Sequence, residues 1–447
     1  MLSCSPQTGD SSITVAFDIR RLVDAHIQRQ VHQGITRYTL RLYQQLSVRP
    51  EEIEVVPVYL HPLDPVRIGL DKTRQQVRAL GALDRDLGLK IELPLARRRP
   101  GARLIGLLDR LEDVFGSLKR PRALLRLAQR KLLETCYLPR ASCPLSADLF
   151  HSPVNPLPAP RRTPSPHRVL TVHDCIYLKR PELYPLRGRT PAIRKALDSL
   201  DLSRDHVICD SSSTRRDLLE LVDLPGDQAH VVPLAADETF RHPDLAAGRH
   251  RLATLGIEPD RYLIALAQRE KRKNIPRLVE AFRRSVASKE FDLLLVASSA
   301  YAPELEGSLA EVGLAGPPVR IATKVDDEAL AGLLALATGF VYVPLYEGFG
   351  MPTLEAMAAG CPVVAADNSS IPEVTADAAR YVDAEDVWSI ADGLDELARD
   401  RALRDRLRAR GLARAMRFSW RRTADETIDV YRLVLDRAAA ASPITPC

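Results

Sequence analysis

Two glutamates flank a glycine-rich turn in the stretch YEGFGMPTLEAMAAG, which runs from Tyr346 to Gly360. Glu347 stands directly before the turn, and Glu355 follows inside what reads as a helix. Carboxylates accept hydrogen bonds from hydroxyl groups. A glycine-rich turn at the start of a helix exposes backbone N–H groups that bind anionic oxygen. A diphosphate flanked by a sugar and a ribose, as in a nucleotide sugar, would satisfy both features.

The same stretch also has a plainer interpretation. Pro352 suits the first turn of a helix and Gly360 suits its end, so the pattern is that of a strand, a turn and a helix. In that interpretation Glu355 complements the helix dipole, and Glu347 is a solvated loop residue. The turn alone does not decide between the two interpretations.

Basic residues and one histidine are the other candidates for chemistry. In the stretch REKRKN, Arg272 and Lys273 offer positive charge to the oxygens of a leaving diphosphate, with Arg269 close by in sequence. His173, in TVHD, ends an apolar run, and Asp174 after it is expected to orient or cap that strand end. A Lys-Arg cluster is more often a solvated face, and a lone histidine is more often structural, so both interpretations stay open.

A regular alternation of strands and helices would position these residues. Short runs rich in Val and Ile, such as ITVAFDI and GFVYVPL, alternate with helical patterns such as IPRLVEAFRRSV and DEALAGLLALA. This alternation predicts an α/β fold with doubly wound parallel sheets, whose ligands bind at the carboxyl ends of the strands. The chain has 447 residues, too many for one core, so we expect two Rossmann-like domains facing across a cleft.

The alternation weakens at about residues 239–259, and we place the domain junction there. We predict an N-terminal domain over residues 1–245, a C-terminal domain over 246–418, and a crossover helix with a tail over 419–447. The last helix is amphipathic and is expected to pack back towards the N-terminal domain. Its expected buried face consists of Trp420, Ile428, Tyr431 and Leu435.

Residues 97–140 do not fit the alternation. The segment holds 12 Lys and Arg against 4 Asp and Glu and reads as a basic helical insert in the N-terminal domain. One interpretation is a helical pair with a solvated cationic face. The other is attachment to an anionic membrane surface or to a polyanionic lipid diphosphate.

The composition is typical of an ordinary globular protein, with 45% hydrophobic and 27% charged residues. Seven cysteines without a C-x-x-C pair argue against a zinc site and a disulfide framework, and they fit a reducing cytosol. We see no leader-like N-terminus and no apolar run long enough to span a bilayer, so we expect a cytoplasmic location. Aromatic residues are scarce, at 5%, and no nucleic-acid module is recognisable, so we expect no nucleic-acid partner.

Several motifs, in sequence order, resemble one enzyme family. Glu347, Glu355 and the turn between them are similar to the Glu-x7-Glu signature of retaining GT-B glycosyltransferases of the family 4 type, group 1. The stretches QGITRYTLRLYQQL, TVHDCIYLKRPELYP, DSSSTRRDLLELV and REKRKNIPRLVEAF resemble successive segments of that family. The match is closest to the mannosyltransferase-rich branch that includes bacterial O-antigen and exopolysaccharide enzymes. Only residues 97–140 have no counterpart in it.

The resemblance implies a role for each candidate residue. Glu347 would lie by the hydroxyl groups of the donor sugar, and Glu355 would bind the ribose. Lys273, aided by Arg272, would neutralise the diphosphate, and His173 would contact the donor sugar near the reacting carbon. The backbone expected to line the donor sugar and the phosphates belongs to Gly348, Phe349, Gly350 and Met351.

The resemblance also implies a reaction. A hexose, with mannose from GDP-mannose as the leading candidate, would pass to a glycan or a polyprenyl-diphosphate-linked acceptor during synthesis of a surface polysaccharide such as lipopolysaccharide. The acceptor is expected near the loop of Gly34, which permits close approach, with Arg37 as a phosphate contact. The family is thought to retain configuration by front-face displacement, and we expect no metal cofactor.

Other assignments stay open at this level. The donor could instead be UDP-glucose, UDP-N-acetylglucosamine or a deoxysugar nucleotide. A non-catalytic scaffold that binds nucleotide sugars is the alternative from another functional class. For the location, the alternative to a purely cytoplasmic protein is peripheral attachment to the inner face of the cytoplasmic membrane.

Overall fold

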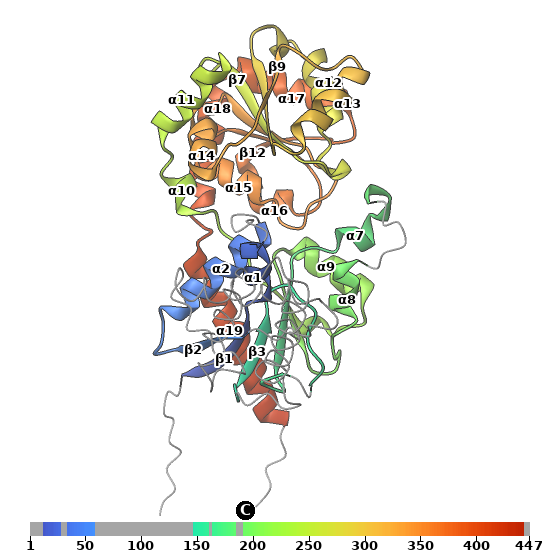
Figure 1. Ribbon diagram of the computed structural model, residues 1–447, viewed down its shortest axis with the longest axis vertical. Helices are drawn as coiled ribbons and strands as arrows, with labels where there is room; N and C mark the ends of the chain where they lie inside the picture. The colour runs from blue at the N-terminus through green and yellow to red at the C-terminus, as the bar shows by residue number, and fades with distance from the viewer. Residues whose placement is uncertain (1–11, 28–33, 59–145, 161–162, 185–190, 442–447) are drawn as a thin grey trace, which may run out of the picture. The chain divides into compact units, whose positions relative to one another are not determined.

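A computed structural model describes residues 12–27, 34–58, 146–160, 163–184 and 191–441. The basic segment at residues 97–140 lies outside these ranges, so both interpretations of it stay predictions. Within the described residues, no helix has the length and apolar character needed to cross a membrane. The helices and some of the strands are labelled in Figure 1.

The first sheet has six strands in the order β2-β1-β3-β4-β5-β6. β1 pairs in parallel with β2 and β3, and β3 pairs in parallel with β4. All residues of β3 and β4 are buried, as expected for strands covered on both faces. The strand bounds are β1 Ile13–Asp18, β2 Ile53–Val58, β3 Leu149–Ser152, β4 Arg168–Val172, β5 His206–Cys209 and β6 Ala229–Val231.

The second sheet also has six strands, in the order β12-β11-β10-β7-β8-β9, and all its neighbours pair in parallel. The chain winds outwards from β7 on one side and from β10 on the other. The carboxyl ends of β7 and β10 therefore form a topological switch point, where doubly wound sheets bind ligands. The bounds are β7 Tyr262–Ala267, β8 Asp292–Ala297, β9 Val319–Ala322, β10 Gly339–Tyr342, β11 Val363–Ala366 and β12 Ala379–Val382. The predicted doubly wound α/β fold is confirmed.

Helices connect the strands of both sheets. Before β7 they are α1 Arg20–Ile27, α2 Gly34–Ser47, α7 Ile176–Lys179, α8 Ala192–Leu197, α9 Ser212–Leu221, α10 Glu238–Arg241 and α11 Leu245–Leu255. From β7 onwards they are α12 Ile275–Arg284, α13 Ala302–Glu311, α14 Asp327–Leu336, α15 Met351–Ala358, α16 Ile371–Thr375, α17 Val387–Arg399, α18 Arg401–Ala415 and α19 Trp420–Ala441.

By their contacts, the residues group into two compact units. The first comprises the chain up to Thr171, residues 195–208 and the chain from Thr427 onwards, and the second comprises residues 172–194 and 209–426. This division rests on contacts between residues and does not test the predicted domain boundaries at residues 245 and 418. Those boundaries stay predictions.

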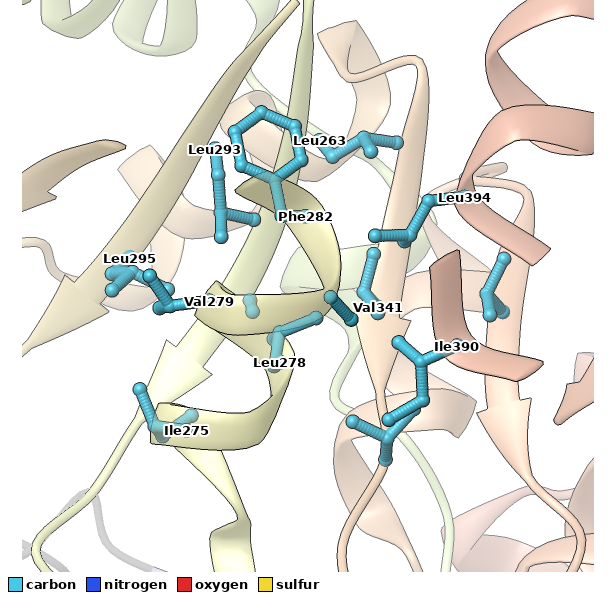
Figure 2. Packing of buried hydrophobic residues seen from close by; sticks show 14 of the residues in the cluster. Leu263, Ile275, Leu278, Val279, Phe282, Leu293, Leu295, Val341, Ile390 and Leu394 are labelled. Atoms are coloured by element: carbon cyan, nitrogen blue, oxygen red, sulfur yellow. The ribbon is translucent and has the colours of Figure 1, made fainter. Parts of the chain in front are cut away.

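The packing of α12 on the second sheet shows why apolar residues at helical spacing predicted this helix correctly. Apolar residues recur in α12 at the spacing of one helix face, and all of them are buried. Figure 2 shows these side chains beside Leu263 of β7, Leu293 of β8, and Ile390 of α17, which belong to the same buried cluster. The α12 residues are Ile275, Leu278, Val279 and Phe282.

The C-terminal helix α19 crosses from the second unit into the first at Thr427. In the first unit, the buried Tyr431 hydroxyl lies 2.6 Å from Nδ1 of His151, and Arg432 pairs with Glu52 at 2.9 Å. The predicted return of this helix to the N-terminal part is confirmed. Three of the four residues of the predicted face are buried, whereas Leu435 is half-buried beside the buried Val434.

Candidate active site

A cluster of buried charges lies at the carboxyl ends of β7 and β10. Lys273 follows β7 in a short 3₁₀ turn, and Glu347 follows Tyr342, the last residue of β10, by five positions. Lys273 and Glu347 are each only 7% exposed, and Tyr342 is 4% exposed. The parallel pairing of β7 with β10 brings these two loops together, although 74 residues separate Lys273 from Glu347.

One carboxylate oxygen holds this cluster together. Oε1 of Glu347 accepts hydrogen bonds from the Tyr342 hydroxyl at 2.6 Å, from Nζ of Lys273 at 2.8 Å, and from the guanidinium of Arg272. Lys273 also donates to the Tyr342 hydroxyl at 2.7 Å, and Arg272 pairs with Glu270 at 2.6 Å. Lys273, Arg272 and Glu347 thus share a site with little exposure to solvent, and the half-exposed Glu270 lies at its edge.

Burial and neighbouring charges act in opposite directions on the pKa values of this cluster. Burial acts to raise the pKa of Glu347, but the charges of Lys273 and Arg272 outweigh it and hold that pKa below its usual value. Burial lowers the pKa of Lys273, and Glu347 offsets only part of that effect. Burial also opposes the charge on Arg272, yet Glu347 raises the pKa of Arg272 above its usual value. The site therefore presents fixed positive charge beside an ionised carboxylate.

The glycine-rich turn next to this cluster has the predicted geometry. Gly350 has a φ of 95°, which favours glycine, and α15 begins directly after it with Pro352 in its first turn. Gly348 is required for a different reason. A Cβ at this position would lie 2.4 Å from the carbonyl oxygen of His173 and 2.6 Å from Cβ of Asp174.

The start of α9 holds the turn in place. The Gly348 carbonyl accepts hydrogen bonds from the hydroxyls of Ser211, at 2.5 Å, and Thr214, at 3.0 Å. The Glu373 carboxylate of α16 accepts from two backbone N–H groups in the first turn of α9, both at 2.7 Å. Asp217 of α9 accepts from the Tyr346 hydroxyl at 2.5 Å. These bonds orient the Gly348–Phe349 peptide.

His173 lies against this turn through its backbone and against Asp210 through its ring. Nδ1 of His173 donates to Oδ2 of Asp210 at 2.7 Å, and Asp210 is 2% exposed. Asp174 accepts from the Ile176 N–H at 3.1 Å, at the start of α7. Burial raises the pKa of Asp174. The hydrogen bond between Nδ1 of His173 and the buried Asp210 carboxylate fixes the orientation of the His173 ring.

The remaining candidates lie in different surroundings. Glu355 is 7% exposed on α15, and Phe349 packs edge-on against Phe418 with ring centroids 6.1 Å apart. Arg269 is not part of the cluster, because its exposed side chain pairs with Glu304. Met351 is the first residue of α15.

In the first unit, Gly34 begins α2 and is exposed, and Arg37 is half-buried on the same helix.

Of the predicted site residues, the structure brings Arg272, Lys273 and Glu347 into hydrogen-bonding contact. The roles assigned to these and to the other candidates stay predictions.

Sequence reasoning missed the groups that support the cluster. Tyr342 lies inside an apolar strand, and Asp210, Ser211 and Thr214 lie where the sequence predicted a strand followed by a helix but no polar contacts. Among the described residues, no group of three or more His, Cys, Asp and Glu side chains is placed to hold a metal ion.

Comparisons with known proteins identify the family. A family model described as Glycosyl transferases group 1 matches residues 252–414. The chain is 31% identical over 278 residues to the O-antigen chain mannosyltransferase B of Escherichia coli, which covers 60% of this chain and 72% of that protein. The chain belongs to the group 1 glycosyltransferases.

This glycosyltransferase is also similar to a relative with another named activity. It is 31% identical over 286 residues to the alpha-maltose-1-phosphate synthase of Mycobacterium tuberculosis, which covers 60% of this chain and 73% of that protein. In fold, it is similar to the solved glycosyltransferase from Rickettsia africae ESF-5, with a TM-score of 0.62 and 14% identity over 95% of this chain and 99% of that one. The fold is GT-B, and the protein is a hexosyltransferase, as predicted.

The close approach at Gly348 leads to a stability prediction. We expect Gly348→Ala to lower the free energy of unfolding by about 1–3 kcal/mol, because the added methyl group overlaps a backbone carbonyl that has little room to move. Chemical unfolding followed by circular dichroism measures the change. The matched control is Gly307→Ala on α13, where a Cβ meets nothing within 4 Å. Equal stability of Gly348→Ala and the wild type would show that the turn can shift.

Proposed function

We propose that this glycosyltransferase moves a hexose, with retention of configuration, from a nucleotide sugar to a glycan or lipid-linked oligosaccharide acceptor. Mannose from GDP-mannose is the leading donor, and synthesis of a bacterial surface polysaccharide is the setting. The relative from Escherichia coli, named for O-antigen chain mannosyl transfer, supports this assignment. The observation that carries the chemistry is the shared carboxylate of Glu347, with Lys273 and Arg272 fixed beside the glycine-rich turn.

Two cations beside the turn suit a diphosphate leaving group. Cleavage of the bond between the sugar and the phosphate develops negative charge on the leaving oxygen. A cation already held in place stabilises that charge mainly in the transition state, where it lowers the barrier. Lys273 is held by Tyr342 and Glu347, so little reorganisation would be needed. A lysine and an arginine can supply the charge that a metal supplies in other enzymes.

The carboxylates would orient the donor. Glu347 has one oxygen engaged by three donors, and its second oxygen would accept from a sugar hydroxyl. Glu355, on the helix that follows the turn, would accept from the ribose. The His173 ring, held by Asp210, would contact the donor sugar near the reacting carbon.

We assign retention to a front-face displacement. The acceptor hydroxyl forms its bond to the sugar carbon on the face from which the diphosphate departs, and the departing oxygen takes the hydroxyl proton. No covalent enzyme intermediate is then needed, and no carboxylate pair for double displacement was recognised in the sequence. Gly34 and Arg37 remain the candidates for the acceptor loop.

A different donor is the second candidate. The relative from Mycobacterium tuberculosis is named for the synthesis of alpha-maltose-1-phosphate, and it matches this chain at the same identity as the mannosyltransferase. A glucosyl donor such as UDP-glucose is therefore the main competitor of GDP-mannose, with UDP-N-acetylglucosamine and deoxysugar nucleotides behind it.

A panel of nucleotide sugars tests the donor. We expect GDP-mannose to raise the melting temperature of the full chain more than equal concentrations of UDP-glucose or UDP-N-acetylglucosamine, because a ligand that binds only the folded state stabilises it. Differential scanning fluorimetry measures the shift, with GMP and mannose as separate controls. A larger shift with UDP-glucose would select the second candidate, and no shift with any nucleotide sugar would contradict the proposed function.

Kinetics of matched lysine variants test the charge at the turn. We expect Lys273→Met to lower kcat by about 10²–10³-fold with a smaller change in donor KM, because its charge acts mainly in the transition state. Lys289→Met removes an exposed lysine from the same unit and should retain wild-type kinetics. Melting curves of both variants separate loss of catalysis from loss of folding. Wild-type kcat in a folded Lys273→Met would exclude this role.

The proposal includes catalysis without a metal. We expect EDTA to leave the initial rate unchanged, because Lys273 and Arg272 supply the positive charge at the leaving group. The assay uses the full chain and the donor selected above, with and without added Mg²⁺ or Mn²⁺. Loss of activity in EDTA that either ion restores would overturn metal independence and leave the donor assignment intact.

A further inference from the structure

Helix α18 and the turn after it form the most basic stretch of the described second unit. Residues 401–422 contain nine arginines and one acidic residue, Asp405, a balance of +8 in a chain whose net charge is only +5. The rest of the chain is therefore slightly acidic in sum. An arginine-rich stretch of this kind calls for a physical explanation.

The arginines divide into two sets. Arg404, Arg408 and Arg414 are half-buried and donate to backbone carbonyls, of Leu397 and Gly360 among others, at 2.8–2.9 Å. These three fix the helix on the domain. The other arginines of residues 401–422 are exposed.

The exposed face of α18 has an apolar stripe with arginines along one side. Three alanines and Met416 recur at helical spacing, and Met416 is 71% exposed. On one side of this stripe stand Arg406, Arg410 and Arg417, all exposed. On the other side stand Leu412, which is 42% exposed, and the exposed Asp405. The alanines are Ala402, Ala409 and Ala413.

Few acidic groups offset this charge. Arg422 pairs with Glu426 at 2.6 Å, and longer pairs join Arg410 to Asp377 at 3.5 Å and Arg401 to Asp405 at 3.8 Å. Exposed pairs of this kind contribute little and are screened by salt. A helix face that combines exposed apolar side chains with exposed arginines is typical of helices that lie on anionic membranes.

We propose that this face of α18, defined by the apolar stripe and by Arg406, Arg410 and Arg417, binds the surface of a membrane that contains anionic lipids. Met416 and Leu412 would enter the headgroup region, and the three arginines would contact the lipid phosphates. Charge complementarity and the exposed apolar stripe favour an anionic lipid surface as the partner of this face. The inference goes beyond the proposed function and does not depend on the donor or the acceptor. A nucleic acid fits less well, because no aromatic side chain is exposed on this face for bases to stack on.

Vesicle binding of charge variants tests the proposal. We expect the full chain to sediment with phosphatidylcholine–phosphatidylglycerol vesicles and not with pure phosphatidylcholine vesicles, and less so as salt rises. The triple variant R406Q/R410Q/R417Q should bind the anionic vesicles about a hundredfold more weakly, because each arginine near such a surface contributes about 1 kcal/mol.

The control removes the same charge elsewhere. R249Q/R261Q/R284Q changes three exposed arginines on other elements of the same unit, and it should bind as the wild type does. The double variant L412S/M416S should keep binding at low salt but lose the part of it that resists high salt. Melting curves confirm that all variants are folded.

Three results would overturn the proposal. They are no binding of the wild type to anionic vesicles, equal binding to neutral and anionic vesicles, and wild-type binding of R406Q/R410Q/R417Q. The third would place the membrane contact elsewhere, with residues 97–140 as the next candidate. Equal loss of binding in the two triple variants would also overturn it, since net charge and not the α18 face would then be responsible. Preferential binding of the α18 face to single-stranded RNA over anionic vesicles would replace the lipid with a nucleic acid.

Discussion

The structure around the candidate site depends on one carboxylate oxygen shared by three donors. Oε1 of Glu347 accepts from Tyr342, Lys273 and Arg272 in a place almost closed to solvent. Removing charges from water is costly, and such a cluster is tolerated only when each charge has partners. Loss of one partner from a buried pair typically costs roughly 3–5 kcal/mol. The cluster therefore fixes the loops after β7 and β10 relative to each other.

The glycine-rich turn is the second constraint, and it follows from the first. Because Glu347 is held, the next residue must pass close to the backbone of His173, and only glycine has room to do so. The hydroxyls of Ser211 and Thr214 then bind the Gly348 carbonyl. Preorganised groups of this kind need not rearrange when charge develops on a ligand, which is a main source of enzymatic rate enhancement.

Positive charge serves two purposes in this chain. Inside the second unit, buried or half-buried cations bind carboxylates and carbonyl oxygens, as Lys273 does with Glu347 and Arg408 does with Gly360. On the exposed face of α18, arginines remain in solvent beside apolar side chains. Burial separates the two sets, since a buried arginine must find acceptors within the protein whereas an exposed one is available to an external anion.

Local chemistry was enough to predict the elements and the turn. The spacing of apolar residues identified α12, and Pro352 and Gly360 marked the limits of α15, because helix periodicity and backbone preference are properties of neighbouring residues. Helix α11 was missed, although Asp244 caps its start and Gly256 ends it in a left-handed conformation. Those two signals were present, but the weak apolar periodicity between them hid the helix.

The composition of the site was only partly predictable. Arg272, Lys273 and Glu347 were chosen from residue type, motif and family resemblance, but nothing local indicated that all three share one oxygen with Tyr342. Asp210 behind His173 was not predicted at all. These contacts arise where strands and loops from distant segments meet, as when β7 pairs with β10. The sequence by itself determined which elements form and which residues can carry charge. Only the tertiary structure decided which of those charges meet, because the strand order of a sheet is set by packing of the whole domain and not by neighbouring residues.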